Sequence, residues 1–124
     1  MTRDEATAFA EHWIRSWNER DLDAILAHYA DAVRFRSPRA AGLLGTPTIE
    51  GKGALASYWR AALDRNTSLH FALDHIVWDG EGAELLIVYV ADIDHRPIRA
   101  CETFRFDPMG RVVEGEAMHG IAAA

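Results

Sequence analysis

Residues 17–38 constrain the fold of this chain more than any other segment of its sequence. Asp21 has the position of a helix cap, just before the apolar face of a short helix. Val33, Phe35 and Ser37 then alternate with arginines, which is typical of a half-buried strand. Pro38 has no N–H to donate to a sheet, so we expect the strand to end there. The segment therefore predicts the end of one helix, a short second helix and a strand.

Two longer helices are expected on either side of this segment. Thr2 and Glu5 have the spacing of a capping box at the start of the first helix. The apolar residues of that helix recur at helical spacing: Ala6, Phe9, Ala10, Trp13, Ile14 and Trp17. A third helix follows residues 51–53 and has its own apolar face: Ala54, Leu55, Tyr58, Trp59, Ala62 and Leu63. Residues 39–50 contain two glycines and a proline and are expected to form a long loop.

The period of the apolar pattern changes from helical to alternating at residue 68. Four strands are predicted, at 68–78, 83–93, 97–106 and 111–120. Turn-forming residues separate them at 79–82, 94–96 and 107–110, so consecutive strands are expected to pair antiparallel. Three helices and an early strand followed by this meander predict an α+β fold, with a sheet wrapped around the helices.

The composition is that of one globular domain, which we assign to residues 1–124. A net charge of −6 and the absence of a basic stripe argue against a nucleic-acid partner. The single cysteine, Cys101, cannot form an internal disulfide and gives no metal-ligand spacing. No signal-peptide pattern is present, and the longest apolar run, 85–91, is too short to span a membrane. These features predict a cytoplasmic protein with no membrane association and no bound metal.

Several short motifs occur in an order that resembles one known superfamily. They are Arg-Asp-Leu-Asp at 20–23, Ser-Pro at 37–38, Gly-Lys-Gly at 51–53, Tyr-Trp at 58–59, Glu-Thr-Phe-Arg-Phe at 102–106 and Gly-Arg-Val-Val at 110–113. Over nearly its whole length, the chain resembles the nuclear transport factor 2-like superfamily, and within it the ketosteroid isomerase and SnoaL-like polyketide cyclase branch. The resemblance implies a cone in which a curved antiparallel sheet and three N-terminal helices enclose a largely apolar pocket. It implies an isomerase- or cyclase-type reaction with no cofactor, although one fold can carry many activities.

The resemblance also implies three catalytic positions, and this chain keeps only part of them. The base position, just before the proline that ends the first strand, holds Ser37, whose hydroxyl is too weak an acid to replace a carboxylate. The position of a helical tyrosine holds Trp13, which can donate a hydrogen bond but cannot exchange a proton. The position of a protonated acid that holds the oxyanion is occupied by Glu102. The family's isomerase reaction is therefore not expected in this chain.

Glu102 and His119 are the candidate catalytic residues. Strand alternation places Glu102 on the same face as Phe104 and Phe106, and burial there would raise its pKa. His119 shares a face with Gly115 and Ala117, which the resemblance directs into the cone, so it can pair with the carboxyl as acid and base. The alternatives are a structural carboxyl bonded to an indole or an imidazole, and a solvated histidine at the rim.

The candidate ligand-binding residues are mostly aromatic. An indole or a phenol presents an apolar face with one polar atom that can orient a flat ligand, whereas the alternative is that these rings only form the core. The set is Trp13, Phe35, Ser37, Trp59, Tyr89 and Phe104. His70 and His75 lie five apart on one predicted strand and are expected on opposite faces, so they are not a metal pair.

Three functions remain open from the sequence. The first is an enzyme of small-molecule acid–base chemistry that needs no cofactor and acts through Glu102 and His119. The second is a ligand-binding or accessory domain without catalysis, because the expected base and phenol are missing. The third is a structural dimer module, since the other face of the central strands is also apolar: Leu86, Val88, Val90 and Cys101. A homodimer that binds a small, largely apolar molecule is expected.

Overall fold

The computed structural model describes residues 1–123, which form four helices and six strands. The helices are α1 (Arg3–Asn18), α2 (Leu22–Leu26), α3 (Pro38–Leu44) and α4 (Lys52–Arg65). The strands are β1 (Tyr29–Arg36), β2 (Thr48–Glu50), β3 (Leu69–Asp79), β4 (Glu84–Ile93), β5 (Arg96–Phe106) and β6 (Val112–Ala122). The ends of the four long strands lie within two residues of the predicted ones. No helix in the described part is long and apolar enough to cross a membrane.

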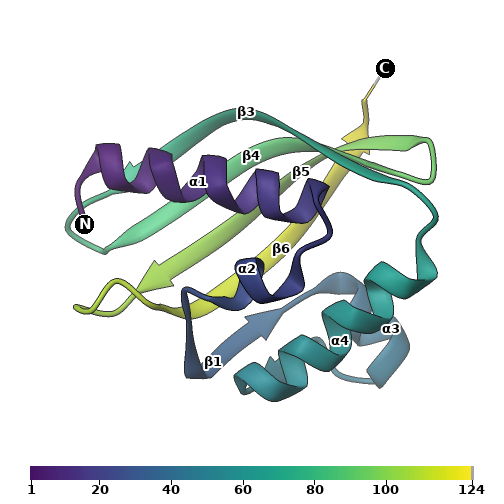
Figure 1. Ribbon diagram of the computed structural model, residues 1–124, viewed down its shortest axis with the longest axis horizontal. Coiled ribbons are helices and arrows are strands. Elements are labelled where there is room, and N and C mark those ends of the chain that lie inside the picture. The colour runs from purple at the N-terminus through teal and green to yellow at the C-terminus, as the bar shows by residue number, and fades with distance from the viewer. Residues whose placement is uncertain (124) are drawn as a thin grey trace.

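All six strands belong to one sheet, in the order β2-β1-β6-β5-β4-β3. Neighbouring strands are antiparallel, with the exception of β1 and β6, which run parallel. The sheet curves around α1, which crosses its inner face, and α4 covers the end that carries β1 (Figure 1). The predicted α+β fold with a curved sheet wrapped around helices is thus confirmed, and α3 is an additional short helix.

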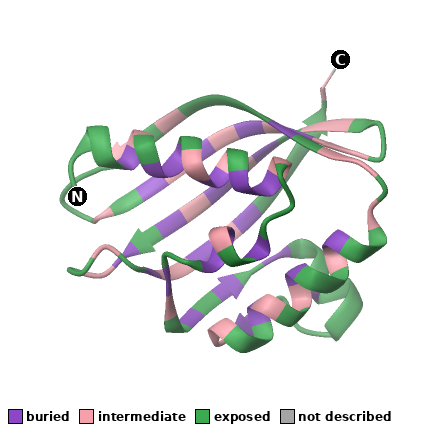
Figure 2. Cartoon of the chain, viewed as in Figure 1, coloured by how far each residue is buried: buried purple, intermediate pink, exposed green. Residues whose placement is uncertain are grey.

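The core lies between the inner face of the sheet and the helices α1, α2 and α4 (Figure 2). The predicted capping box is present: Thr2 Oγ1 accepts from Glu5 N at 3.1 Å, and Thr2 N donates to Glu5 Oε1 at 2.8 Å. From that start, the helical period turns one face of α1 toward the sheet, where Phe9 contacts Phe104 and Phe106 edge to face. The apolar face predicted for this helix is therefore the face that is buried.

The loop predicted for residues 39–50 is instead a helix, a turn and a strand. Ser37 Oγ accepts a hydrogen bond from Arg39 N at 3.3 Å and caps α3, while Pro38 occupies its first turn. Gly45 ends the helix in the left-handed region, at φ 77°, where a glycine avoids the strain of a side chain. Strand β2 then pairs antiparallel with β1. The prediction was wrong because a helix this short has no apolar period to detect.

The parallel pairing of β1 with β6 joins the two halves of the chain. Phe35 lies opposite Gly115, and the next inward residue of β1, Ser37, follows at the end of the strand. A side chain at Gly115 would place its Cβ 3.1 Å from the carbonyl oxygen of Thr103 and 3.3 Å from the ring of Phe35. The absence of a side chain therefore lets the Phe35 ring pack directly on β6.

A bulge in β3 corrects the prediction for its two histidines. His70 pairs with Asp92 and His75 with Val88, and the register shifts between Leu73 and His75. Asp92 and Val88 have the same parity on β4, so the two histidines share a face. They remain far apart, roughly 13 Å along the strand. Within residues 1–123, no group of three or more His, Cys, Asp or Glu side chains is arranged to hold a metal ion.

The close contact at Gly115 makes a prediction about stability. Gly115→Ala should lower the free energy of unfolding by about 1–3 kcal/mol, because its Cβ meets backbone and a buried ring. Gly53→Ala is the matched control, since it lies inside α4 and its Cβ would have nothing within 4 Å. That variant should raise the stability by at most about 0.5–1 kcal/mol, the gain of alanine over glycine inside a helix, because Gly53 is the second residue of α4. Urea denaturation of both variants measures the difference, and equal effects would contradict the packing described.

Candidate functional site

The helices and the inner face of the sheet line a cavity of about 80 Å³ that is open at one end, here called the cone cavity. Seven of the eight predicted site residues line it: Trp13, Phe35, Ser37, Trp59, Tyr89, Glu102 and His119. Phe104 is the exception. It is 1% exposed, it is absent from the lining, and its ring centroid lies 5.4 Å from that of Trp13. Phe104 therefore supports the cavity wall from behind rather than forming it.

Glu102 is the buried carboxyl of the cone cavity. It lies on β5 between Ile87 of β4 and Ala117 of β6, and it is only 5% exposed. Burial raises its pKa from 4.5 to about 8, and the neighbouring Tyr89 phenol, which can hydrogen-bond to the carboxylate, opposes that shift. Its Oε2 has no hydrogen-bond partner in the described residues. At neutral pH, this side chain is mainly the uncharged acid.

Three further buried polar atoms of the aromatic core form no hydrogen bond within residues 1–123. They are the indole nitrogens of Trp13 and Trp17 and the hydroxyl of Tyr29. Burial and the adjacent Glu102 raise the pKa of Tyr29 well above its usual value, so its hydroxyl keeps its proton. A buried polar group without a partner costs about 1–3 kcal/mol. Trp13 and Trp17 line the cone cavity together with Glu102, whereas Tyr29 does not, so two indole donors and one acid are available to a ligand there.

His119 lies at the rim of the same cavity. It pairs with Ala100 in the sheet register, so its side chain is on the inner face with Glu102. Although His119 is exposed at this rim, partial desolvation of the ring and the positive charge of Arg39 lower its pKa, so the imidazole is neutral at pH 7. No hydrogen bond joins His119 to Glu102 among the described residues. The structure therefore brings the predicted pair into one cavity without a hydrogen bond between them.

The hydroxyl of Ser37 already has partners. Ser37 Oγ lies 3.1 Å from the hydroxyl oxygen of Tyr58, a hydrogen-bond distance, and it also caps α3 through Arg39 N. The side chain is 6% exposed and lines the cavity beside Tyr58. No base lies within hydrogen-bond distance of it in the described part of the chain, so the geometry does not activate it as a nucleophile.

The sequence analysis missed nine lining residues as site residues, among them Arg39, Tyr58, Asn66 and Phe71. Phe71 stacks on Trp13, with ring centroids 5.7 Å apart, but the bulge in β3 hides its parity from a simple alternation. Arg39 belongs to the segment predicted as a loop. Asn66 ends α4, and helical spacing placed Tyr58 on the same face as Trp59 without showing that its hydroxyl reaches Ser37.

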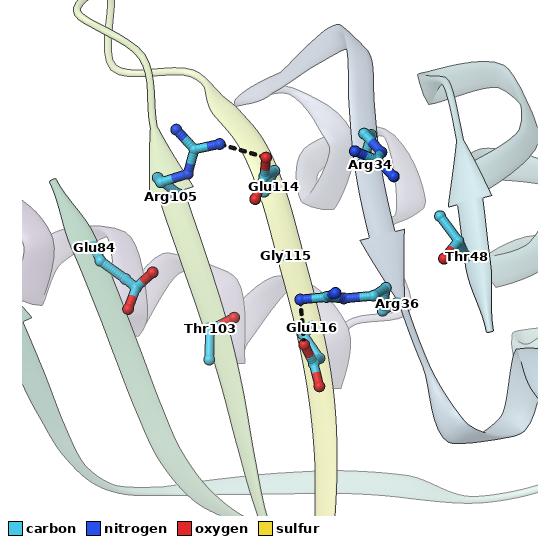
Figure 3. Close-up of a pocket in the computed structure, with 9 residues that line it drawn as sticks. All are labelled: Arg34, Arg36, Thr48, Glu84, Thr103, Arg105, Glu114, Gly115 and Glu116. Atoms are coloured by element: carbon cyan, nitrogen blue, oxygen red, sulfur yellow. Dashed lines mark ion pairs between the residues drawn. The ribbon is translucent and has the colours of Figure 1, made fainter. Parts of the chain in front are cut away.

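A second, polar cleft lies on the outer face of the sheet and is separate from the cone cavity (Figure 3). Its arginines and glutamates form ion pairs with one another, with Arg36 Nη2 2.8 Å from Glu116 Oε1 and Arg105 paired with Glu114. These pairs are solvent-exposed and contribute little to stability. The arginines of this cleft therefore lie on the outer face, and their charges are already balanced.

The buried Glu102 predicts a specific pH dependence of stability. In the folded state the Glu102 carboxyl has a pKa of about 8, and in the unfolded chain its pKa is about 4.5. Its contribution to the free energy of unfolding is therefore fully present below pH 4.5 and is lost as the pH rises through 8. The full loss corresponds to about 5 kcal/mol. Glu102→Gln should remove this dependence, so the free energy of unfolding of the variant should increasingly exceed that of wild type as the pH rises. Chemical denaturation from pH 5 to 9 measures it, with the exposed Glu84→Gln as control. Parallel profiles for all three proteins would rule out the buried acid.

The comparisons with known proteins agree with this geometry. The model of the SnoaL-like domain family matches residues 10–115. A SnoaL-like protein of unknown function from Burkholderia thailandensis is 34% identical, with 96% of this chain and 97% of that chain covered and a TM-score of 0.87. A protein of unknown function with a cystatin-like fold from Methylobium petroleophilum is 23% identical, with 100% and 81% covered and a TM-score of 0.79.

More distant structures have the same fold. The epoxide hydrolase/cyclase-like enzyme SalBIII, described in pyran ring formation in the polyether salinomycin, is 17% identical, with 94% of this chain and 92% of that chain covered and a TM-score of 0.75. No curated protein matches the chain significantly. The family model covers most of the sequence, and the Burkholderia protein matches almost end to end. The chain therefore belongs to the SnoaL-like domain family, which has the nuclear transport factor 2-like fold.

Proposed function

We propose that this protein binds a small, largely apolar molecule in the cone cavity and that Glu102 acts on it as a neutral acid. The observation that carries the proposal is the environment of Glu102, which is buried, protonated at neutral pH and left with a free oxygen. An acid in this state can donate a hydrogen bond, or a proton, to a carbonyl, hydroxyl or epoxide oxygen of the ligand. The indole N–H groups of Trp13 and Trp17 would hold the same oxygen or its neighbour.

The class of reaction is acid–base chemistry that needs no cofactor, of the isomerase, cyclase or dehydratase type. Glu102 would transfer its proton to the ligand oxygen as negative charge develops there, and the neutral His119 at the rim would accept a proton from the ligand. The two side chains line one cavity with no hydrogen bond between them in the described residues, so both would be available to a ligand there. Ser37 would orient the ligand through its hydroxyl and would not act as the base.

The family supports this proposal at the level of the fold. SalBIII, which is described as epoxide hydrolase/cyclase-like, has the same arrangement of helices and sheet. TerC, whose structure was determined with polyporic acid, has a TM-score of 0.77 at 12% identity. Both show that this fold can carry small-molecule sites. The chemistry proposed for this chain rests on its own residues.

A ligand-binding domain without catalysis is the second candidate, and one observation favours it. The family's base position holds Ser37, whose hydroxyl hydrogen-bonds to Tyr58 and accepts from Arg39 N as the cap of α3, so no strong base faces Glu102 from that side. In that case, the unpaired donors of the cavity would hold a ligand that leaves unchanged.

The cytoplasmic location stays a prediction from the sequence.

Glu102→Gln separates the two candidates. Glutamine keeps the shape and a hydrogen-bond donor but cannot transfer a proton. Ligands from a panel of steroids, polyketides and aromatic acids should quench the tryptophan fluorescence of wild type and variant alike, because three tryptophans line the cavity. Turnover of a quenching ligand should fall by about 10²–10⁴-fold in the variant. Glu84→Gln, on the outer face, is the control. Turnover that survives in Glu102→Gln would remove Glu102 from the mechanism, and no turnover in wild type would favour the second candidate.

We also propose that the protein is a homodimer that pairs the outer faces of its sheets. Val88, Cys101 and Met118 lie in one register row across β4, β5 and β6, with their side chains directed away from the core. Met118 is 45% exposed, and the other two are partly exposed. A row of apolar side chains across three central strands is typical of a surface that a partner covers.

Val88→Arg should convert the dimer to a monomer. Two copies of the new charge would meet near the centre of the interface, where neither has an acidic partner in the same row. Sedimentation velocity at micromolar concentration measures the molecular mass, and Met109→Arg, at an exposed turn, controls for the added charge. A wild-type monomer under these conditions, or a Val88→Arg dimer, would disprove the interface.

A further inference from the structure

Three cavities meet at the open end of the cone, and Arg39 and Asn66 line all of them. The first is the cone cavity. The second is an apolar groove of about 410 Å³ between α3 and α4, which lie side by side (Figure 1). The third is a cleft of about 370 Å³ beside the turn between β4 and β5. We call the shared region the mouth and define it by Arg39, Tyr58, Ala62 and Asn66, of which Tyr58 and Ala62 line the first two cavities.

The mouth is positively charged, although the whole chain carries a net charge of −6. Three arginines line its cavities: Arg39, Arg65 and Arg96. None of them is in an ion pair within residues 1–123, whereas four arginines of the sheet are paired: Arg34, Arg36, Arg99 and Arg105. The three arginines of these cavities therefore lack the carboxylate partners that the arginines of the outer face have.

The carboxylates near the mouth do not neutralise these arginines. Besides the buried Glu102, Asp94 is the one acidic residue that lines any of the three cavities within the described chain. Asp94 Oδ1 accepts hydrogen bonds from Thr67 N at 2.9 Å, Thr67 Oγ1 at 2.8 Å and Ser68 N at 3.0 Å. That carboxylate holds the start of β3 in place. Nothing else in the described residues competes for the guanidinium of Arg39 as an ion-pair partner.

The size of the cone cavity indicates that a ligand extends past Arg39. Pockets for small organic molecules have volumes of about 300–1,000 Å³, and the cone cavity alone, at about 80 Å³, holds little more than the reacting end of such a molecule. The groove between α3 and α4 adds apolar surface from Leu43 and Leu44, which are 53% and 57% exposed. A ligand that reaches from Glu102 into this groove must pass the guanidinium.

We propose that the ligand is an apolar organic acid whose anionic group is bound by Arg39 at the mouth. This inference rests on the proposed function and specifies its ligand class. The apolar body of the molecule occupies the cone cavity and the groove between α3 and α4, and the Asn66 side chain is placed to donate a second hydrogen bond to the anion. The planar guanidinium suits a carboxylate or a sulfonate, because it offers two parallel N–H donors.

A matched pair of fluorescent probes tests the role of the charge. 8-Anilinonaphthalene-1-sulfonate carries an anionic group, and N-phenyl-1-naphthylamine has the same ring skeleton without it. Wild type should bind both and favour the sulfonate. Arg39→Gln should weaken binding of the sulfonate by about tenfold, because it removes a charge-assisted hydrogen bond that solvent partly screens at the mouth. Binding of the neutral probe should stay unchanged. Arg39→Lys should bind the sulfonate with an affinity between those of wild type and Arg39→Gln.

Two further variants locate the effect. Arg111→Gln removes the same charge from an exposed position that lines none of these cavities, and it should leave both affinities unchanged. Ala62→Phe fills the mouth and should weaken both probes. If both probes bind wild type and Arg39→Gln equally, the anionic ligand is wrong while the cavity proposal stands. Sulfonate binding that survives Ala62→Phe would place the anion elsewhere and also overturn the inference. If neither probe binds wild type, both proposals fail.

Discussion

The parallel pairing of β1 with β6 is the interaction on which the site depends. The two strands come from opposite ends of the chain, and everything between them, from α3 to β5, lies in the connection. Without this pairing, Glu102 and His119 would lie on a sheet whose inner face is covered only by α1. With it, Phe35, Ser37 and α4 close the cone from the other side. The cavity is therefore a product of the closure and does not exist in either half of the chain alone.

The inward position of Glu102 could be predicted from the sequence because the central strands keep a regular register. Strands β4 and β5 pair without a bulge, so the alternation of Ala100, Glu102 and Phe104 gives their face directly. The same argument was wrong for His70 and His75, because the bulge between them shifts the parity of β3 by one residue. Alternation is reliable along a strand only as far as its ladder is uninterrupted.

The mouth could not be predicted for a different reason. The signals of α3 are present in the sequence, with Ser37 as cap, Pro38 in the first turn and Gly45 at the end. A helix of seven residues, however, has too few turns to show an apolar face, so the segment has the composition of a loop. The importance of Arg39 depends further on where α3 lies relative to α4 and to the β4–β5 turn. That placement depends on tertiary contacts, so the local sequence pattern of residues 39–50 does not predict it.

The protonation of Glu102 and the charge of Arg39 together give the cavity a direction. An ionised Glu102 would repel an anionic ligand and would lack a partner for its own charge, so burial keeps it neutral at the closed end. Arg39, at the open end, remains charged and unpaired among the described residues. An acidic molecule would therefore enter with its uncharged end first, and its anionic group would stop at the mouth. The acid–base chemistry proposed for Glu102 would then act on the uncharged end of the ligand, far from the ligand's anionic group.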